Sequence, residues 1–110
     1  MRRDLRVSWY HKKQFMDCKR VVFSGHAIQR MFERGIGRDH VLAVIARGDM
    51  IAEYADDKPY PSRLLLGVVE AKPLHVVLAA DEGVGLGIVV TVYEPSVEHW
   101  GEDFRTRKMK

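Results

Sequence analysis

The hydrophobic periodicity of the chain changes once, near Met50, and this change limits the folds open to it. Before that point, apolar residues recur at the spacing that places them on one side of a helix. After it, runs rich in valine, isoleucine and leucine alternate with short connections, which is typical of an antiparallel meander. Helices followed by a series of strands indicate an α+β domain. We therefore predict two N-terminal helices packed on a four-stranded, mainly antiparallel sheet.

Glycines and a capping residue mark the ends of both predicted helices. Ser24 can cap a helix that runs to about Arg34, and Gly35 can end it in the left-handed conformation. A second helix fits residues 38–47, with Gly48 as its stop. The sequence thus predicts two short helices in close succession.

Four strands are predicted from Met50 onward. They span residues 50–54, 63–70, 74–81 and 86–94. The connections 71–73 and 82–85 have lengths suited to hairpins, whereas two prolines exclude regular structure from 56–61. Residues 64–66 and 88–90 are apolar on both alternating faces. We therefore expect the central strands to be covered on both sides, partly by the helices, with a partner chain as a candidate for the rest.

A chain of 110 residues suits one domain with a single core. We place this domain at residues 21–104, beginning with a short extended stretch at 21–23, between a basic N-terminal extension (1–20) and a basic tail (105–110). The sequence has no apolar run of membrane-spanning length and no secretory signal, so we expect a cytoplasmic protein without membrane contact. The single cysteine, Cys18, has no partner for an internal disulfide.

The formal net charge of +3 is unevenly distributed. Residues 1–20 hold seven Lys or Arg and two Asp, and residues 105–110 hold four Lys or Arg and no acidic residue. The residues between them hold seven basic and thirteen acidic side chains. Basic ends around an acidic body favour a phosphate-bearing or an acidic protein partner, and the alternative is that both ends are solvated tails.

His26, Arg30 and Arg34 follow one another at a spacing of four in the first predicted helix, and we call them the basic stripe. Like charges at this spacing repel and lower helix stability, so their presence needs a reason. On a helix the stripe lies along the edge of the apolar sector to which Ala27 and Met31 belong. From that edge an arginine can reach either a structural carboxylate on the sheet or a bound anion, and both interpretations stay open.

Two further polar side chains lie in apolar strands. His75 stands between Leu74 and Val76 and needs a hydrogen-bond partner there, while Tyr93 stands at the end of the last strand. The sequence does not define the hairpin register, so their position relative to each other and to the basic stripe is open. The five histidines are scattered without a close pair, so we predict no metal site and no cofactor.

Five short blocks of sequence occur in a fixed order. They are Ser24-x-His26-Ala27-x-x-Arg30-Met31-x-x-Arg34-x-Ile36, Ile51-x-x-Tyr54, Pro59-x-Pro61, Pro73-Leu74-His75-Val76-Val77 and Thr91-x-Tyr93-x-Pro95. With these blocks, about residues 21–100 resemble a bacterial family known as domain of unknown function 4258. Proteins similar to this family are often encoded beside small zinc-finger antitoxins of the MqsA type. The resemblance therefore implies a toxin partner, similar in architecture to the RelE and MqsR messenger-RNA-cleaving toxins.

This analogy implies a chemistry for the basic stripe. Metal-free RNA cleavage needs a group that moves protons and cations that offset the charge on the reacting phosphate. We accordingly predict a toxin-like, metal-independent ribonuclease with His26 or His75 in proton transfer, Arg30 and Arg34 on the phosphate, and Tyr93 positioning the substrate. Further RNA contacts are assigned to Lys19, Arg20, Lys58 and Arg63.

The alternative is a non-enzymatic protein-binding module in which the basic stripe is structural. The acidic middle of the chain favours this alternative, because a ribonuclease needs positive charge where RNA lies. Binding of nucleic acid through the basic ends alone is a third interpretation. The partners in question are RNA, a cognate antitoxin protein and a second copy of the chain.

Overall fold

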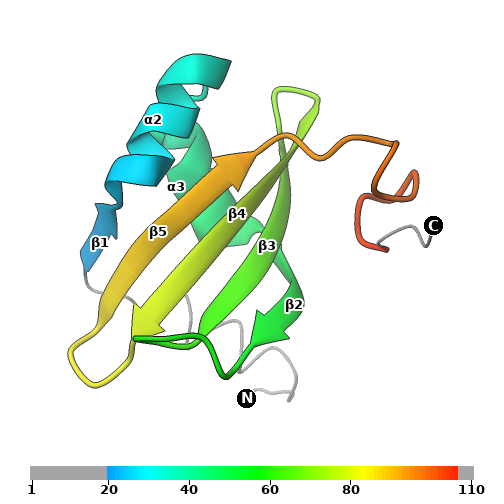
Figure 1. Ribbon diagram of the computed structural model, residues 1–110. Helices are drawn as coiled ribbons and strands as arrows, with labels where there is room; N and C mark the ends of the chain where they lie inside the picture. Colours follow the sequence, from blue (N-terminus) through cyan, green and yellow to red (C-terminus); the bar gives the residue numbers. More distant parts are fainter. Residues whose placement is uncertain (1–19, 107–110) are drawn as a thin grey trace, which may run out of the picture.

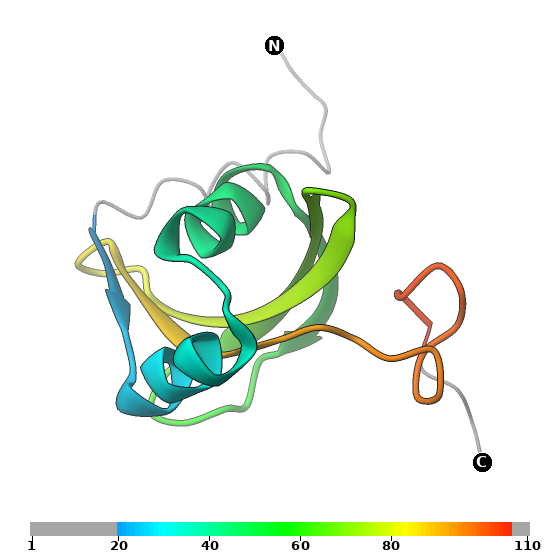
Figure 2. The same ribbon diagram turned by 90° about the horizontal axis from the view of Figure 1, so that it is seen from above.

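A five-stranded sheet curves around one helix and carries a second helix beside its edge in the computed structural model, which describes residues 20–106 (Figures 1 and 2). The elements are β1 (Arg20–Phe23), α2 (Gly25–Arg34), α3 (Arg38–Arg47), β2 (Asp49–Tyr54), β3 (Ser62–Val69), β4 (Lys72–Asp81) and β5 (Leu86–Tyr93). The strand order is β1-β5-β4-β3-β2, and only β1 pairs in parallel. The α+β class and both predicted helices are confirmed.

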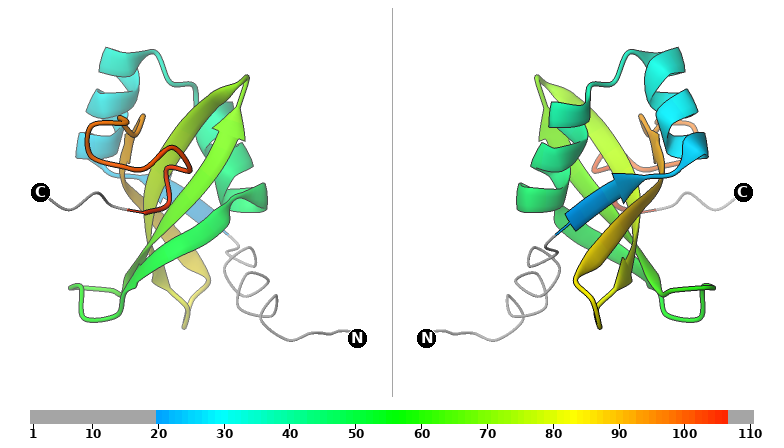
Figure 3. Two further views of the ribbon diagram at one scale, coloured as in Figure 1. Left: turned by 90° about the vertical axis from the view of Figure 1, so that its right-hand side faces the viewer. Right: turned by 90° about the vertical axis from the view of Figure 1, so that its left-hand side faces the viewer.

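The sheet has five strands, one more than the four that the sequence predicts. The short extended stretch before the first helix forms β1, which pairs in parallel with β5, so that Val21 lies opposite Gly87 and Phe23 opposite Val89. The right-hand view of Figure 3 shows β1 leading into α2 alongside β5. A strand of four residues that pairs with the far end of the chain leaves no local signal in the sequence.

The first hairpin also differs from prediction. Glu70 and Ala71 form the turn with positive φ angles of 53° and 69°, so β4 begins at Lys72 and not after Pro73. Pro73 pairs with Val68 on β3, and β5 has already ended on its other side. A proline is therefore tolerated at this position, because no strand on the other side of β4 would accept a hydrogen bond from a backbone N–H here.

The helix ends follow the predicted residues. The Ser24 hydroxyl accepts the Ala27 N–H at 3.0 Å and donates to the Val90 carbonyl at 3.0 Å. Gly35 ends α2 with a φ angle of 66°, in the left-handed region that favours glycine. The bond to Val90 fastens the start of α2 to β5, and this fixes the side of the sheet to which the basic stripe is held.

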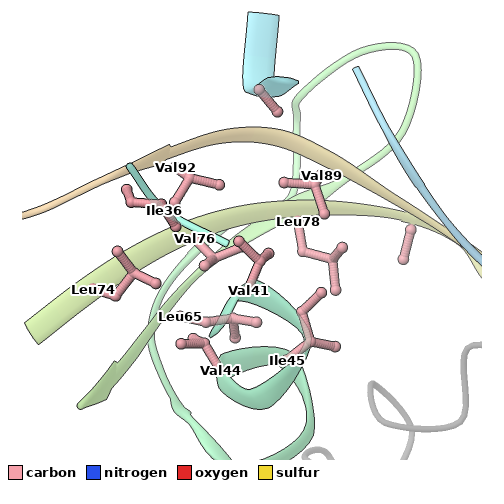
Figure 4. Packing of buried hydrophobic residues seen from close by; sticks show 12 residues of the cluster. Ile36, Val41, Val44, Ile45, Leu65, Leu74, Val76, Leu78, Val89 and Val92 are labelled. Atoms are coloured by element: carbon pink, nitrogen blue, oxygen red, sulfur yellow. The ribbon is translucent and has the colours of Figure 1, made fainter. Parts of the chain in front are cut away.

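The core lies between α3 and the concave face of the sheet (Figure 4). Its buried members are Ala27, Ile36, Val41, Val44, Ile45, Leu65, Leu74, Val76, Leu78, Ala80, Val89 and Val92. The helix approaches β3 closely at Gly67, where a Cβ atom would lie 2.9 Å from the Val44 side chain. Glycine therefore lets α3 pack directly on the strand.

The opposite face of the sheet is covered in part by the segment after β5, coloured orange to red in Figures 1 and 3. Trp100 is buried there, with its ring centroid 4.6 Å from that of His75. Arg105 pairs with Asp49 at the start of β2. Most of residues 97–104 form turns.

Other predictions concern the chain ends and the membrane. Most of the predicted N-terminal extension and the last four residues, 107–110, lie outside the described residues. No helix within residues 20–106 is long and apolar enough to cross a membrane.

Candidate functional site

A cleft of about 370 Å³ is lined by residues of α2 and of the end of β5, and we call it the α2–β5 cleft. Figure 1 shows α2 beside β5. Its lining residues are Arg30, Arg34, Thr91, Tyr93, Glu94, Pro95, Ser96, His99 and Trp100. They come from α2, from the end of β5 and from the segment that follows β5. The structure thus brings three of the predicted site residues, Arg30, Arg34 and Tyr93, to one cavity.

The basic stripe is not neutralised by the sheet. Arg30 lies 3.9 Å from Glu33 on the same helix, and both side chains are exposed by more than two fifths. Between residues 20 and 106, neither Arg34 nor His26 forms an ion pair. An exposed pair at such a distance stabilises little, so the guanidinium groups remain open to an anion in the cleft.

His75 is fully buried on β4, and both of its ring nitrogens have partners. Nε2 lies 2.8 Å from the Phe104 carbonyl oxygen and Nδ1 lies 3.2 Å from the Tyr93 hydroxyl. A carbonyl oxygen only accepts, so Nε2 carries the proton and Nδ1 accepts from Tyr93. Burial lowers the pKa of His75, although the bond to Phe104 opposes this effect, and the ring is therefore neutral near pH 7.

This burial bears on the proton-transfer role predicted for His75. Its ring has no contact with solvent, so it cannot exchange a proton directly with a substrate. The pairing of β4 with β5 places His75 opposite Tyr93. The sequence had left the relative position of these two residues open. The histidine therefore orients the Tyr93 hydroxyl, whose proton points to the interior while its oxygen can accept hydrogen bonds.

His26 is exposed one turn before Arg30 and is not among the residues that line the α2–β5 cleft. The histidine in the cleft is His99, which was not among the predicted site residues. Its Nδ1 lies 3.0 Å from the Ser96 hydroxyl, and within residues 20–106 its Nε2 has no hydrogen-bond partner. The sequence signal was a serine and a histidine three residues apart after Pro95, next to Tyr93. Only the tertiary structure brings this turn to α2.

The residues predicted to contact RNA do not extend the cleft. Lys19 lies outside the described residues. Arg20 pairs with Leu86 at the start of β5, and exposed Lys58 lies in the loop before β3, so both are at the opposite end of the sheet from the cleft (Figure 1). Arg63 is at that end too, and its guanidinium is bound by two carboxylates. They belong to Glu53, at 3.3 Å, and Glu82, at 3.6 Å.

The chemistry of the cleft suits an anion better than a metal ion. In the part of the chain that the structure describes, no three His, Cys, Asp or Glu side chains are grouped closely enough to hold a metal. Arginine forks bind phosphate oxygens in two directions, and an imidazole can move protons near neutral pH. The groups gathered here therefore fit a phosphate-bearing ligand.

Comparison with known proteins assigns the chain to a family. A family model described as Domain of unknown function (DUF4258) matches residues 23–94, which is more than half of the chain, so the chain belongs to this family. The match includes Arg30, Arg34 and Tyr93 but ends before His99. No curated protein and no solved structure matches the chain.

Proposed function

We propose that this DUF4258 protein is a toxin-like ribonuclease that cleaves RNA in the α2–β5 cleft without a metal ion. The observation that carries the proposal is the meeting of Arg30, Arg34, Tyr93 and His99, from three separate parts of the chain, around one cavity. A resemblance to RelE-type and MqsR-type toxins suggested this type of function, but it is an analogy between families and not a motif in these residues. That analogy concerns architecture and chemistry alone.

The two arginines offset charge on the reacting phosphate. Arg30 and Arg34 are four residues apart on α2 and line the same cavity, so both can approach the non-bridging oxygens of one phosphate. The extra negative charge of the transition state is stabilised by such fixed cations more than the ground state is. The repulsion between the two arginines, which costs helix stability in the free protein, falls when the anion binds.

His99 takes the proton. With Nδ1 held by Ser96, Nε2 can accept the proton of a ribose 2′-hydroxyl in the cleft. The 2′-oxygen then attacks the phosphorus, the bond from phosphorus to the 5′-oxygen breaks, and the leaving 5′-oxygen takes a proton from water. The hydroxide that remains takes the proton from His99, which restores the base. The products are a 2′,3′-cyclic phosphate and a free 5′-hydroxyl. Tyr93 contributes a fixed hydrogen-bond acceptor, because its own proton is directed at His75.

The test is cleavage of a fluorescent single-stranded RNA by the purified full chain in the presence of a chelator. We expect cleavage of RNA and not of the corresponding DNA, with a loss of about a hundredfold or more for His99→Ala. Arg30→Ala combined with Arg34→Ala should also abolish cleavage. The matched control is Arg38→Ala combined with Arg47→Ala, which removes the same charge from exposed positions on α3 outside the cleft.

Two outcomes would contradict the proposal. One is intact RNA with the folded native chain, and the other is undiminished cleavage by a folded Arg30→Ala, Arg34→Ala variant. Circular dichroism and thermal unfolding of each variant establish that it is folded. Incubation in the absence of the chelator shows whether a metal ion changes the rate.

A protein-binding module is the second candidate, and exposed apolar residues on α2 favour it. The apolar sector predicted for this helix is divided: Ala27 is buried, whereas Ile28 is 55% and Phe32 is 88% exposed. Apolar side chains beside arginines would suit a protein partner with acidic and apolar groups, such as a cognate antitoxin. Intact RNA in the assay above would make this the leading function.

A further inference from the structure

A second, smaller cavity adjoins the α2–β5 cleft. It has a volume of about 110 Å³ and lies between the end of α2, the start of α3 and the turn from β3 to β4. Its lining residues are Arg34, Gly35, Ile36, His40, Val69, Glu70, Lys72, Leu74 and Glu94. Arg34 and Glu94 line both cavities. We call this cavity the turn pocket, and a ligand bound in the cleft can extend into it past these two side chains.

Only one pair of the charged groups around the turn pocket is in contact among the described residues. Among the described residues, Arg34, Lys72 and Glu94 take part in no ion pair, while His40 lies 3.4 Å from the carboxylate of Glu70. The pocket thus offers cations and carboxylates together. The turn pocket is lined by two carboxylates, Glu70 and Glu94, whereas the cleft is lined by Glu94 alone, so a bare phosphate suits the turn pocket less well than a ligand with both donors and acceptors.

Part of the wall of the pocket is apolar. Ile36 and Leu74 belong to the buried core and also line the cavity. A surface with apolar walls and a rim of hydrogen-bonding groups fits a nucleobase, which has flat faces and an edge of donors and acceptors. The position of the pocket beside a proposed phosphate site agrees with this, since a base and its phosphate are joined through one ribose.

Guanine matches the pattern of charges better than the other bases. Its N1–H and its 2-amino group are neighbouring donors that one carboxylate can accept, and its O6 and N7 are acceptors for a lysine or an arginine. Adenine, cytosine and uracil lack two neighbouring donors on this edge. Arg34, Lys72 and Glu94 all line this pocket, so Glu94 can accept from the two donors while Lys72 or Arg34 donates to O6 and N7, and this set of groups favours guanine.

We propose that the turn pocket binds a guanine base of RNA beside the phosphate that is cleaved. The identity of the polymer rests on the proposed ribonuclease function, but binding of the base does not require catalysis. The direct test is titration of the full chain with the four nucleoside 5′-monophosphates, followed by calorimetry or by NMR. Guanosine monophosphate should bind about tenfold to a hundredfold more tightly than adenosine monophosphate.

Variants separate the pocket from the cleft. Lys72→Ala and Glu94→Gln should each reduce the preference for guanosine monophosphate, and inosine monophosphate, which lacks the 2-amino group, should bind less tightly to the native chain. Asp39→Asn is the matched control for the carboxylate, because Asp39 is exposed on α3 and lines neither cavity. Equal affinity for all four nucleotides, or no binding, would overturn the proposal.

A cleavage assay keeps the two proposals apart. RNAs that differ at one position, guanine, inosine or adenine, are compared for the rate of cleavage beside that position. Guanine-selective nucleotide binding without any cleavage would support the proposed guanine pocket and contradict the proposed ribonuclease function. Cleavage at equal rates beside every base, with no preference in nucleotide binding, would support the proposed ribonuclease function and contradict the proposed guanine pocket.

Discussion

Tyr93 and His75 lie directly opposite each other on β5 and β4, and the Tyr93 hydroxyl is 3.2 Å from Nδ1 of His75. The second ring nitrogen of His75 is bonded to the Phe104 carbonyl at 2.8 Å. The wall of the α2–β5 cleft is thereby linked through a buried ring to the segment after β5. Changes at His75, or in the turn that carries Phe104, should act on Tyr93 through these bonds.

The buried histidine predicts a pH dependence of stability. Burial lowers the pKa of His75 from its ordinary value of 6.5, so below that value the unfolded chain binds a proton that the folded chain does not. Stability is therefore full above about pH 6.5 and falls as the pH drops toward the lowered pKa, with a slope of at most about 1.4 kcal/mol per pH unit. Urea unfolding between about pH 7.5 and pH 5 measures this slope.

Replacement of His75 by glutamine should remove that contribution from the slope. His26→Gln is the matched control, because it removes an exposed histidine and leaves the buried bonds intact. If His75→Gln unfolds with the same pH dependence as the native chain, another group is responsible for the acid sensitivity.

A second prediction concerns the turn at Asp103. Its Oδ1 accepts the N–H groups of Arg105, at 2.9 Å, and Thr106, at 3.2 Å, and these bonds lower the pKa of Asp103. The turn holds Phe104 at a φ angle of 58° and presents its carbonyl to His75. Asp103→Ala should therefore speed solvent exchange of the proton on His75 Nε2, which NMR of the imidazole detects.

Lowering the pH should speed solvent exchange at His75 Nε2 in the same way as Asp103→Ala. Because the pKa of Asp103 is lowered in the folded chain, the stabilisation from its carboxylate is present above its ordinary value of 3.8 and is lost as the pH falls through the lowered pKa. Glu102→Ala is the neighbouring control. Unchanged exchange at His75 in Asp103→Ala would mean that other contacts hold the turn.

The helix ends could be predicted because their signals are local. Ser24 and Gly35 act on backbone groups within one turn, and both function as expected. β1 could not be counted as a strand of the sheet, because its pairing with β5 spans most of the chain. The register between His75 and Tyr93 was likewise open, since the apolar strands on either side have no unique alignment.

The candidate site could be predicted only where its residues have a local signal in the sequence. Arg30 and Arg34 stand out by their repulsive spacing, which is a local feature. His99 lies 65 positions beyond Arg34 in a turn with no periodicity, and only the course of the chain after β5 brings it to the cleft. Its meeting with α2 depends on packing and not on a motif.

A third prediction tests the close approach of α3 to the sheet. A Cβ atom on Gly48 would lie 2.6 Å from the Val44 carbonyl oxygen and 2.8 Å from that of Leu66. Both contacts are with backbone atoms, which cannot move aside easily, so Gly48→Ala should lower the free energy of unfolding by about 1–3 kcal/mol. Gly25→Ala is the control, because no atom lies within 4 Å of its added Cβ. Equal stability of the two variants in urea would show that the backbone yields at Gly48.

The last prediction separates the two bonds of Ser24. The hydroxyl caps α2 through Ala27 and also donates to the Val90 carbonyl, which joins the helix to β5. Ser24→Ala removes both bonds and should cost about 1 kcal/mol of unfolding free energy, the usual effect of losing such a cap. Ser24→Asp keeps the cap but has no proton for Val90, whereas Ser24→Thr can keep both. If the free energy of unfolding in urea of Ser24→Asp equals that of Ser24→Thr, the cap alone stabilises the fold. If it equals that of Ser24→Ala, the bond to Val90 is what holds α2 and its arginines against β5.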